Sequence, residues 1–439
     1  MAKSAFLTVD RAAPYAAQFA KTGEEPVWLV SLRHDAMAQF QSEGFPTLRT
    51  EAWKYTNLER LTREVFTPAD GLVRIEEARI APYKIDAHLL VFVDGTFFSG
   101  LSELALLPEG SSLLSLGRAI EFAPELIEAR LGHRDSALAA LNLALAKDGA
   151  VIVLPKGVAL DKPIHVIHVS TGRERAAHHL RHVIALGENA AATVVESYIG
   201  CGPGTTWTNA ITEVKLARGA RLNHCKWVEE TEAALHTGRL ALDLDRNATV
   251  EVFVGAANAG IARNEVVAYL AGEGAEARID GISLGRGHAH IDDWTEVVHV
   301  APRTNSRQVF KSVLDDRSHS AFQGRVVVKE GAQKVDAHQT NRNLLLSRGA
   351  RADSKPELEI LADDVKCSHG ATVGDLDKNS MFYLRSRGIP EAEARALLVE
   401  AFVAELVEQV SAAPVRDWLM ARMESWLVSE RVKTAVAAA

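Results

Sequence analysis

Cysteine is scarce in this sequence. The 439 residues include three, Cys201, Cys225 and Cys367, and a disulfide-stabilised secreted domain needs a denser framework than that. The N-terminus lacks a basic segment followed by an apolar stretch, and no apolar run approaches the roughly 20 residues of a membrane-spanning helix. We therefore expect a soluble cytoplasmic protein without a membrane partner.

Dense runs of basic residues are also missing. The formal net charge is −8 and the isoelectric point is about 6.1, so we expect no nucleic-acid-binding surface. Apolar residues make up 47% of the chain and charged residues 24%, which is ordinary for a globular protein and argues against disorder. The chain is too long for one ordinary compact domain, but it suits an elongated one.

The motifs of self-contained cofactor enzymes do not occur. There is no G-x-x-x-x-G-K-[ST] loop for a nucleotide phosphate, no C-x-x-C, no H-E-x-x-H, and no G-x-S-x-G in a strand–turn–helix context. We therefore predict that the chain alone is not an enzyme.

Short runs typical of β-strands, by contrast, dominate the sequence from Gly149 to about Val373. A Gly or Asn followed by Ala recurs between these runs. The alanines stand at positions 190, 220, 248, 275 and 332, at intervals of 30, 28, 27 and 57 residues, and a further unit follows at Gly349-Ala350. Gly and Asn tolerate the left-handed conformation of a tight corner, and the small alanine lets neighbouring coils stack.

This period decides between repeat architectures. A unit built from strands alone excludes helix-pair solenoids and βαβ sheets, and a β-propeller blade needs a longer period of about 40 residues. We therefore predict a mainly β fold whose core is a parallel β-helix, with alternating Val, Ile, Leu and Ala lining its interior. An antiparallel sandwich or barrel is the alternative, although Asn-Gly hairpin turns are scarce here.

The pattern divides the chain into three predicted parts. They are a mainly helical, mixed N-terminal domain (1–148), the parallel β-helix core (149–373) and a helical C-terminal domain (374–439). Within the first part we predict a helix over residues 26–41 and a hairpin over residues 88–98, and we interpret the aromatic stretch 51–58 as an anchor packed on the domain.

Apolar residues at helical spacing return in the C-terminal part. We predict helices over 379–387, from Pro390 onward and from Pro414 onward. Trp418 and Trp426 lie on one face of the last helix. They form either intramolecular core or a docking face for a partner.

One cysteine and one histidine near the end of the β region are candidate metal ligands. Cys367 and His369 are two residues apart on an extended segment, so their side chains point to the same side. A thiolate and an imidazole suit soft or borderline metals, including iron in clusters. The alternative is a small buried thiol beside a surface imidazole.

The remaining histidines and cysteines are weaker candidates. His288 and His290, followed by Asp292 and Asp293, have the same alternation, but polar residues are common on the outer face of a solenoid and we favour that interpretation. We expect the histidines beside the strand near residue 180 to be solvated; they are His178, His179 and His182. We expect Cys201 and Cys225 to be packing residues.

The sequence resembles one protein family over most of its length. The similar segments are residues 334–347 (KVDAHQTNRNLLLS) and 352–389, and the similarity extends upstream through 287–333 and 236–253. These segments are similar to the SufB/SufD family, the scaffold proteins of the SUF iron–sulfur cluster assembly system. Residues 51–58 (EAWKYTNL) fit the SufD branch of that family rather than the SufB branch.

The resemblance implies a fold and a function. The fold is a right-handed parallel β-helix flanked by helical terminal domains. The function is that of a non-enzymatic scaffold subunit that pairs with a SufB-like paralogue and binds a SufC-like ATPase through its C-terminal helices. It would contribute to iron acquisition and nascent cluster formation at the SufB–SufD interface, where His369 matches the histidine implicated in cluster or iron binding and Cys367 is its neighbour.

The number of available ligands limits what the chain holds by itself. An iron–sulfur cluster normally needs about four ligands, mostly thiolates, and Cys367 has no companion cysteine between Ala332 and the C-terminus. We therefore expect a transient cluster or iron shared with the SufB-like partner, and none bound by this chain alone.

Pairing needs a surface, and two other functions remain open. The strands of residues 332–360 are expected to end the β-helix as an open edge, and the same edge can also join two copies into a homodimer. One alternative is the SufB-type family member, which the shortage of C-terminal cysteines disfavours. The other is a polysaccharide-acting β-helix enzyme, for which the only acidic candidates are Asp292, Asp293 and Glu296.

Overall fold

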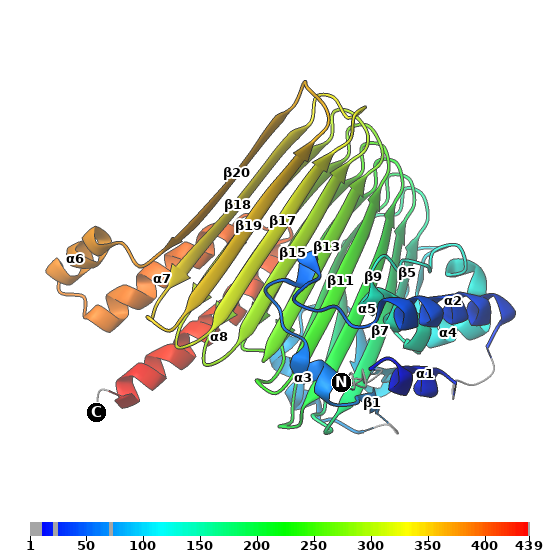
Figure 1. Cartoon of the computed structure of the whole chain (residues 1–439), viewed down its shortest axis with the longest axis horizontal. Helices are drawn as coiled ribbons and strands as arrows, with labels where there is room; N and C mark the ends of the chain where they lie inside the picture. The colour runs from blue at the N-terminus through cyan, green and yellow to red at the C-terminus, as the bar shows by residue number, and fades with distance from the viewer. Residues whose placement is uncertain (1–10, 21–24, 70–72, 438–439) are drawn as a thin grey trace, which may run out of the picture.

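The computed structural model of the chain describes residues 11–20, 25–69 and 73–437. The parallel β-helix is confirmed: from Ala150 onward, successive strands alternate between two ten-stranded sheets, and within each sheet a strand pairs with the strands of the previous and the following coil. Figure 1 shows the stacked coils, with the N-terminal helices beside the first coils and the C-terminal helices across the far side.

The strands of the first sheet are β1 (Thr67–Pro68), β4 (Ser112–Ser115), β5 (Ala150–Leu154), β7 (Ala176–Leu186), β9 (Thr206–Leu216), β11 (Leu235–Leu244), β13 (Ile261–Leu270), β15 (His290–His299), β17 (His319–Val328) and β19 (Arg351–Ile360). The strands of the second sheet are β2 (His88–Val93), β3 (Thr96–Phe97), β6 (Ile164–Ser170), β8 (Ala191–Gly200), β10 (Arg221–Glu229), β12 (Thr249–Ala257), β14 (Glu276–Gly285), β16 (Asn305–Leu314), β18 (Asp336–Leu345) and β20 (Lys366–Gly374).

The helices lie before and after these coils. They are α1 (Ala13–Phe19), α2 (Val27–Glu43), α3 (Glu59–Arg63), α4 (Leu116–Phe122), α5 (Ala137–Leu145), α6 (Lys378–Ser386), α7 (Glu391–Val407) and α8 (Ala413–Ala437), with a 3₁₀ turn at Glu51–Trp53. None of the helices in the described part of the chain has the length and apolarity needed to cross a membrane.

The corners of the coils have the conformation that the Gly/Asn-Ala repeat predicts. The left-handed residues are Asn189 (φ 57°), Gly219 (φ 69°), Asn247 (φ 54°) and Gly274 (φ 74°). The alanine after each of them is fully buried, so consecutive corners stack directly. The paired residues 191, 221, 249 and 276 of consecutive coils follow the same 30-, 28- and 27-residue steps.

The last two repeats of this pattern are built differently. Gly331 and Gly349 are not left-handed, so the expectation of a left-handed corner is wrong for both. A side chain at Gly349 would lie 2.4 Å from the Asp316 carbonyl oxygen, so glycine is required there by close packing rather than by φ. The left-handed residues of these coils include Asp316 and Lys334.

The histidines of β7 are buried, which contradicts the expectation that they are solvated. The strand is covered on both faces. His182 points into the β-helix, where its Nδ1 accepts a hydrogen bond from the Ala150 N–H at 2.8 Å. His179 faces the N-terminal helices and contacts the Trp207 ring. Burial lowers the pKa of His182, and it lowers the pKa of His179 to about 3, so both imidazoles are neutral.

Part of the N-terminal region belongs to the β-helix. The hairpin expected over 88–98 is confirmed, with Asp94 and Gly95 both at positive φ in its turn. Its first strand, β2, also pairs in parallel with β6. The N-terminal part of the chain therefore supplies a strand to the second sheet.

The aromatic stretch 51–58 is an anchor, as predicted. Trp53 is buried, and the Arg263 guanidinium lies 4.0 Å from the centre of its ring. The Gln323 side chain donates a hydrogen bond to the Ala52 carbonyl at 3.1 Å. Arg263 lies on β13 and Gln323 on β17, so the stretch crosses several coils of the first sheet.

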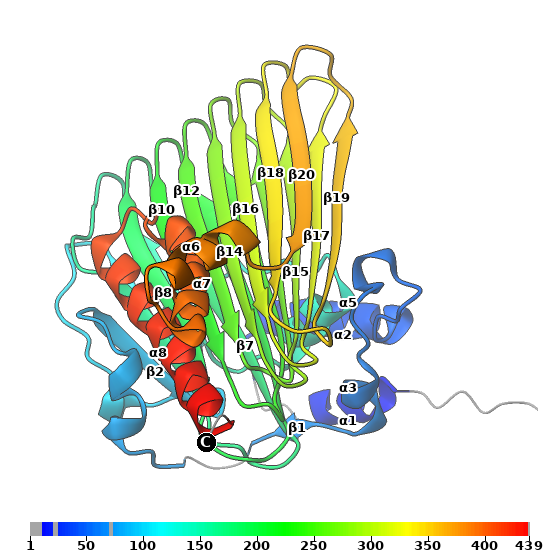
Figure 2. The same ribbon diagram turned by 90° about the vertical axis from the view of Figure 1, so that its left-hand side faces the viewer.

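The C-terminal helices cover the outer face of the second sheet (Figure 2). Trp418 and Trp426 are buried in one apolar cluster with Cys225 and Trp227 of β10. Both tryptophans are therefore intramolecular core, and the docking-face alternative is wrong for them. The buried Lys311 side chain ties α7 to β16 by donating to the Phe402 carbonyl and to Glu405, each at 2.6 Å.

Candidate metal site at the open end of the β-helix

The β-helix ends in two unpaired strand edges. β20 pairs with β18 alone, and β19 pairs with β17 alone, so each is the terminal strand of its sheet. Figure 2 shows both strands at the far end of the stack. The sequence placed this edge at residues 332–360. That range is correct for β19 but not for β18, which β20 covers.

Cys367 and His369 lie on β20 and face the interior side of the coil. Cys367 is the Cα partner of Ala337, and His369 is the partner of Gln339. Ala337 and Gln339 are both buried inside the β-helix. Because side chains on paired positions share a face, Cys367 and His369 lie on the interior side too. No further coil follows β20, so this side is open next to them.

The two candidate ligands have different surroundings. Cys367 is half-buried against the apolar side chains of Val335 and its neighbours. Burial, and secondly the negative charge of Asp336, raise the pKa of the Cys367 thiol. The thiol therefore stays protonated at neutral pH until a cation or a partner group stabilises the thiolate. The His369 side chain is exposed and makes no hydrogen bond with the described residues.

Two buried polar side chains beside them lack partners, and sequence reasoning missed both. The amide oxygen and nitrogen of Gln339 and the hydroxyl of Ser354 are buried without a hydrogen bond. Buried polar groups are rarely left unpaired, so this end of the interior is suited to a further polar group. The sequence signal for Gln339 is its position at every second residue of β18, which places it on the same buried face as Ala337 and Asn341.

The donor set fits iron–sulfur chemistry only in part. A thiolate and an imidazole are both ligands of iron in clusters. Nowhere in the described residues do three or more Cys, His, Asp or Glu side chains gather in a group able to hold a metal ion. A metal bound by Cys367 and His369 would therefore need further ligands from outside the described residues.

The histidine–aspartate run of residues 288–293 does not assemble into a single site. His288 is an exposed turn residue, whereas His290 begins β15. Asp292 is buried on the outer face in an ion pair with Arg263. Asp293 points inward, where its carboxylate accepts a hydrogen bond from the Ser283 hydroxyl at 2.7 Å. Asp293 therefore does not share a face with Asp292 and Glu296, the other two acidic candidates for a polysaccharide-cleaving site.

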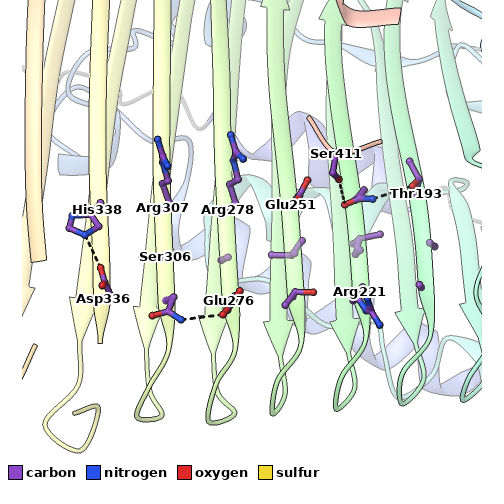
Figure 3. Close-up of a pocket in the computed structure, with 18 of the residues that line it drawn as sticks. Thr193, Arg221, Glu251, Glu276, Arg278, Ser306, Arg307, Asp336, His338 and Ser411 are labelled. Atoms are coloured by element: carbon purple, nitrogen blue, oxygen red, sulfur yellow. Dashed lines mark hydrogen bonds and ion pairs between the residues drawn. The ribbon is translucent and has the colours of Figure 1, made fainter. Parts of the chain in front are cut away.

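A polar groove of about 860 Å³ runs along the outer face of the second sheet (Figure 3). Both acidic and basic residues line it, and some of its polar side chains pair with each other. Asn305 donates to Glu276 at 3.2 Å, and His338 lies 2.7 Å from Asp336. The groove has the character of a solvated outer face, and its last strand carries His338 on the side opposite to Gln339.

These features define a class of protein: an elongated parallel β-helix with a long open edge and with a cysteine and a histidine on its last strand. The chain belongs to the SufBD family. The model for "SUF system FeS cluster assembly, SufBD core domain" matches residues 168–402, and the model for "SufBD protein N-terminal region" matches residues 20–166.

Curated relatives agree with this family. The chain is 32% identical to the iron–sulfur cluster assembly protein SufD of Escherichia coli over 391 residues, which cover 88% of the chain and 90% of that protein. It is 28% identical to the SufD protein of Bacillus subtilis over 433 residues, or 95% of the chain and 98% of that protein. A SufBD family protein of Synechocystis is 29% identical over 413 residues, 91% of each chain.

The raised pKa of Cys367 predicts slow alkylation. The rate of reaction with iodoacetamide should rise with pH to a midpoint above 9.0, the ordinary value for a thiol, when peptide mass spectrometry follows this residue. Asp336→Asn should lower the midpoint by less than burial raises it, because burial is the larger cause. A wild-type midpoint at or below 9.0 would contradict the described surroundings of the thiol.

Proposed function

We propose that the chain acts in the cytoplasm as a SufD-type scaffold subunit of a SUF iron–sulfur cluster assembly complex and has no catalytic activity of its own. One observation carries the proposal: the β-helix stops at an open edge whose last strand presents Cys367 and His369 on its interior side. Two relatives that are named SufD and are similar to most of the chain support the proposal.

The open edge is the proposed surface for a SufB-like paralogue. β19 has ten residues and β20 has nine, and each leaves one row of backbone N–H and C=O groups without a neighbouring strand. A partner with the same fold can continue both ladders by strand addition. Two copies of this chain can join through the same edge, which makes a homodimer the form expected without the paralogue.

Nascent clusters or iron are the proposed cargo at this junction. Cys367 and His369 supply two ligands, and the partner's edge supplies the others, so that the site forms only when the two edges meet. Neither subunit then retains the cargo tightly after separation. This arrangement suits a protein that assembles clusters and passes them on.

The C-terminal helices are the proposed docking surface for a SufC-like ATPase. Two adjacent aromatic residues of α6, Phe382 and Tyr383, are 74% and 57% exposed. Beside α6 lies a groove of about 310 Å³ whose lining includes Val373 of β20 and Phe402 of α7. Because β20 ends at Gly374 and α6 begins at Lys378, an ATP-driven movement of α6 would be transmitted directly to the strand that carries the ligands.

Replacement of His369 tests the ligand assignment. His369→Ala, co-expressed with the SufB-like and SufC-like partners, should lower the iron and acid-labile sulfide content of the complex by about tenfold or more, since it removes a ligand outright. Complex formation should not change, because the side chain is exposed and unbonded. His338→Ala, an exposed histidine on the opposite face of β18, is the matched control. Cluster content equal to wild type in His369→Ala would reject the assignment.

Replacement of the α6 aromatics tests the ATPase surface. The double variant Phe382→Ala/Tyr383→Ala should weaken binding to the SufC-like ATPase by about tenfold or more, or ~1.4 kcal/mol, measured by calorimetric titration. Unfolding by urea should be unaffected, since neither side chain is buried. Phe122→Ala, which removes an exposed aromatic from α4, is the control. Equal affinity in all three proteins would exclude α6 as the contact.

A further inference from the structure

A row of four hydrogen bonds links the anchor stretch 51–58 to the edge strand β19. It begins at the Asp292 carboxylate, which contacts the Thr56 hydroxyl. The Thr56 oxygen lies 2.8 Å from His290 Nε2, and His290 Nδ1 lies 3.0 Å from His319 Nδ1. His319 Nε2 then lies 2.6 Å from the Asp353 carboxylate. The row runs over the outer face of the first sheet.

The strand register brings these residues together. His290 of β15 and His319 of β17 are direct Cα partners, so their rings lie side by side with centres 4.8 Å apart. Asp292 is two residues beyond His290 on the same face. Asp353 of β19 is two residues beyond the partner of His319. Thr56 comes from the N-terminal part of the chain, 236 residues before Asp292 in sequence.

The row needs more protons than its neutral groups supply. Both ends are carboxylates, which accept hydrogen bonds and do not donate. Four hydrogen bonds between them require four protons. The Thr56 hydroxyl brings one, and a neutral imidazole brings one from each of His290 and His319, which makes three. A fourth proton must therefore be bound for the row to be complete.

The surroundings indicate where that proton resides. Arg263 forms a buried ion pair with Asp292, so the negative charge at this end of the row already has a partner. Burial lowers the pKa of His290 to about 4; the neighbouring carboxylate of Asp292 opposes this shift, and the charge of Arg263 adds to it. His319, in contrast, is partly exposed and directly contacts Asp353. The fourth proton is best placed on His319.

The other charges around the row do not replace this proton. Arg351 lies 3.9 Å from the Asp353 carboxylate, too far for a hydrogen bond. Lys355 of β19 is paired with Glu51 and Glu357. Glu265 of β13 is taken by the guanidinium groups of Arg239 and Arg263.

We propose that His290 and His319 share a bound proton, as an imidazole and an imidazolium, and that this proton makes a pH-sensitive latch between the anchor stretch and β19. When the proton leaves, two nitrogen lone pairs face each other at 3.0 Å, and the hydrogen bond between the rings is lost. Below about pH 4 His290 is itself protonated, and two N–H groups then face each other. The stability that the latch provides is therefore present above that pH and is lost as the pH rises and the shared proton leaves. The contacts of Trp53 with Arg263 and of Ala52 with Gln323 do not depend on this proton, so the stretch loosens locally rather than detaching.

One substitution separates this proposal from an ordinary histidine–aspartate contact. In Asp353→Asn the new amide N–H donates to His319 Nε2, so the row contains four protons with every group neutral. The hydrogen bonds then persist without a bound proton. Asp336→Asn makes the same change at an exposed aspartate that contacts His338 on the other sheet, and it should leave the row unaltered.

The experiment is ¹⁵N-imidazole NMR of the metal-free full-length protein at about pH 7, with signals assigned from His319→Gln and His290→Gln. Wild type and Asp336→Asn should show the His319 ring protonated on both nitrogens and a downfield N–H protected from exchange, while Asp353→Asn should show both rings neutral. As the pH is raised from about 6 to about 8, the urea concentration at the midpoint of unfolding should fall more steeply in wild type than in Asp353→Asn.

Two outcomes would overturn the proposal. The first is a wild-type protein in which both rings are neutral, or an Asp353→Asn protein that keeps the doubly protonated ring. The second is an NMR signal of the bonded pair of rings that appears only when a divalent metal such as Zn²⁺ is added, since the cation between the rings would then be a metal ion.

Discussion

A parallel β-helix cannot satisfy the backbone hydrogen bonds of its own last coil. From β5 to β18, every described strand has a neighbour on both sides within its sheet, but β19 and β20 have one each. Their outer rows of N–H and C=O groups need another strand or water. The candidate site follows from this constraint. The candidate ligands are on β20, and the buried polar groups without partners belong to Gln339 of β18 and Ser354 of β19.

The two ends of the stack manage this constraint in different ways. At the N-terminal end the sheets finish in β3 and β4, which have two and four residues and pair antiparallel with their neighbours. Short edges resist the addition of another strand. At the C-terminal end the edges have the full strand length. The asymmetry favours the C-terminal edge as the surface proposed for a partner, and the same end carries Cys367 and His369.

The sequence predicted the features that depend on local geometry. The corner residues of the coils, such as Asn189 and Gly219, report a backbone conformation that few residue types adopt, so their spacing revealed the coil period. The alternation of Cys367 and His369 likewise predicted a shared face. The family resemblance supplied the expectation that these two residues are functional, which spacing alone did not establish.

The remaining features depend on which elements pack together, and a single sequence does not report that. The burial of His179 results from helices of the N-terminal part that cover β7. The burial of Trp418 results from α8 lying on the second sheet. The proton row depends on Thr56 meeting β15 across more than half the chain. In each case the residue type fits two environments, and the tertiary structure selects one.

The central claim is that one copy of the chain holds too few ligands for a cluster. The most direct measurement is anaerobic reconstitution with iron and sulfide, followed by iron and acid-labile sulfide analysis of the monomer isolated by gel filtration. The account predicts no stable cluster on the monomer, and clusters only in species where two open edges meet, whether with a SufB-like partner or with a second copy. A stable, stoichiometric cluster on the monomer would contradict it.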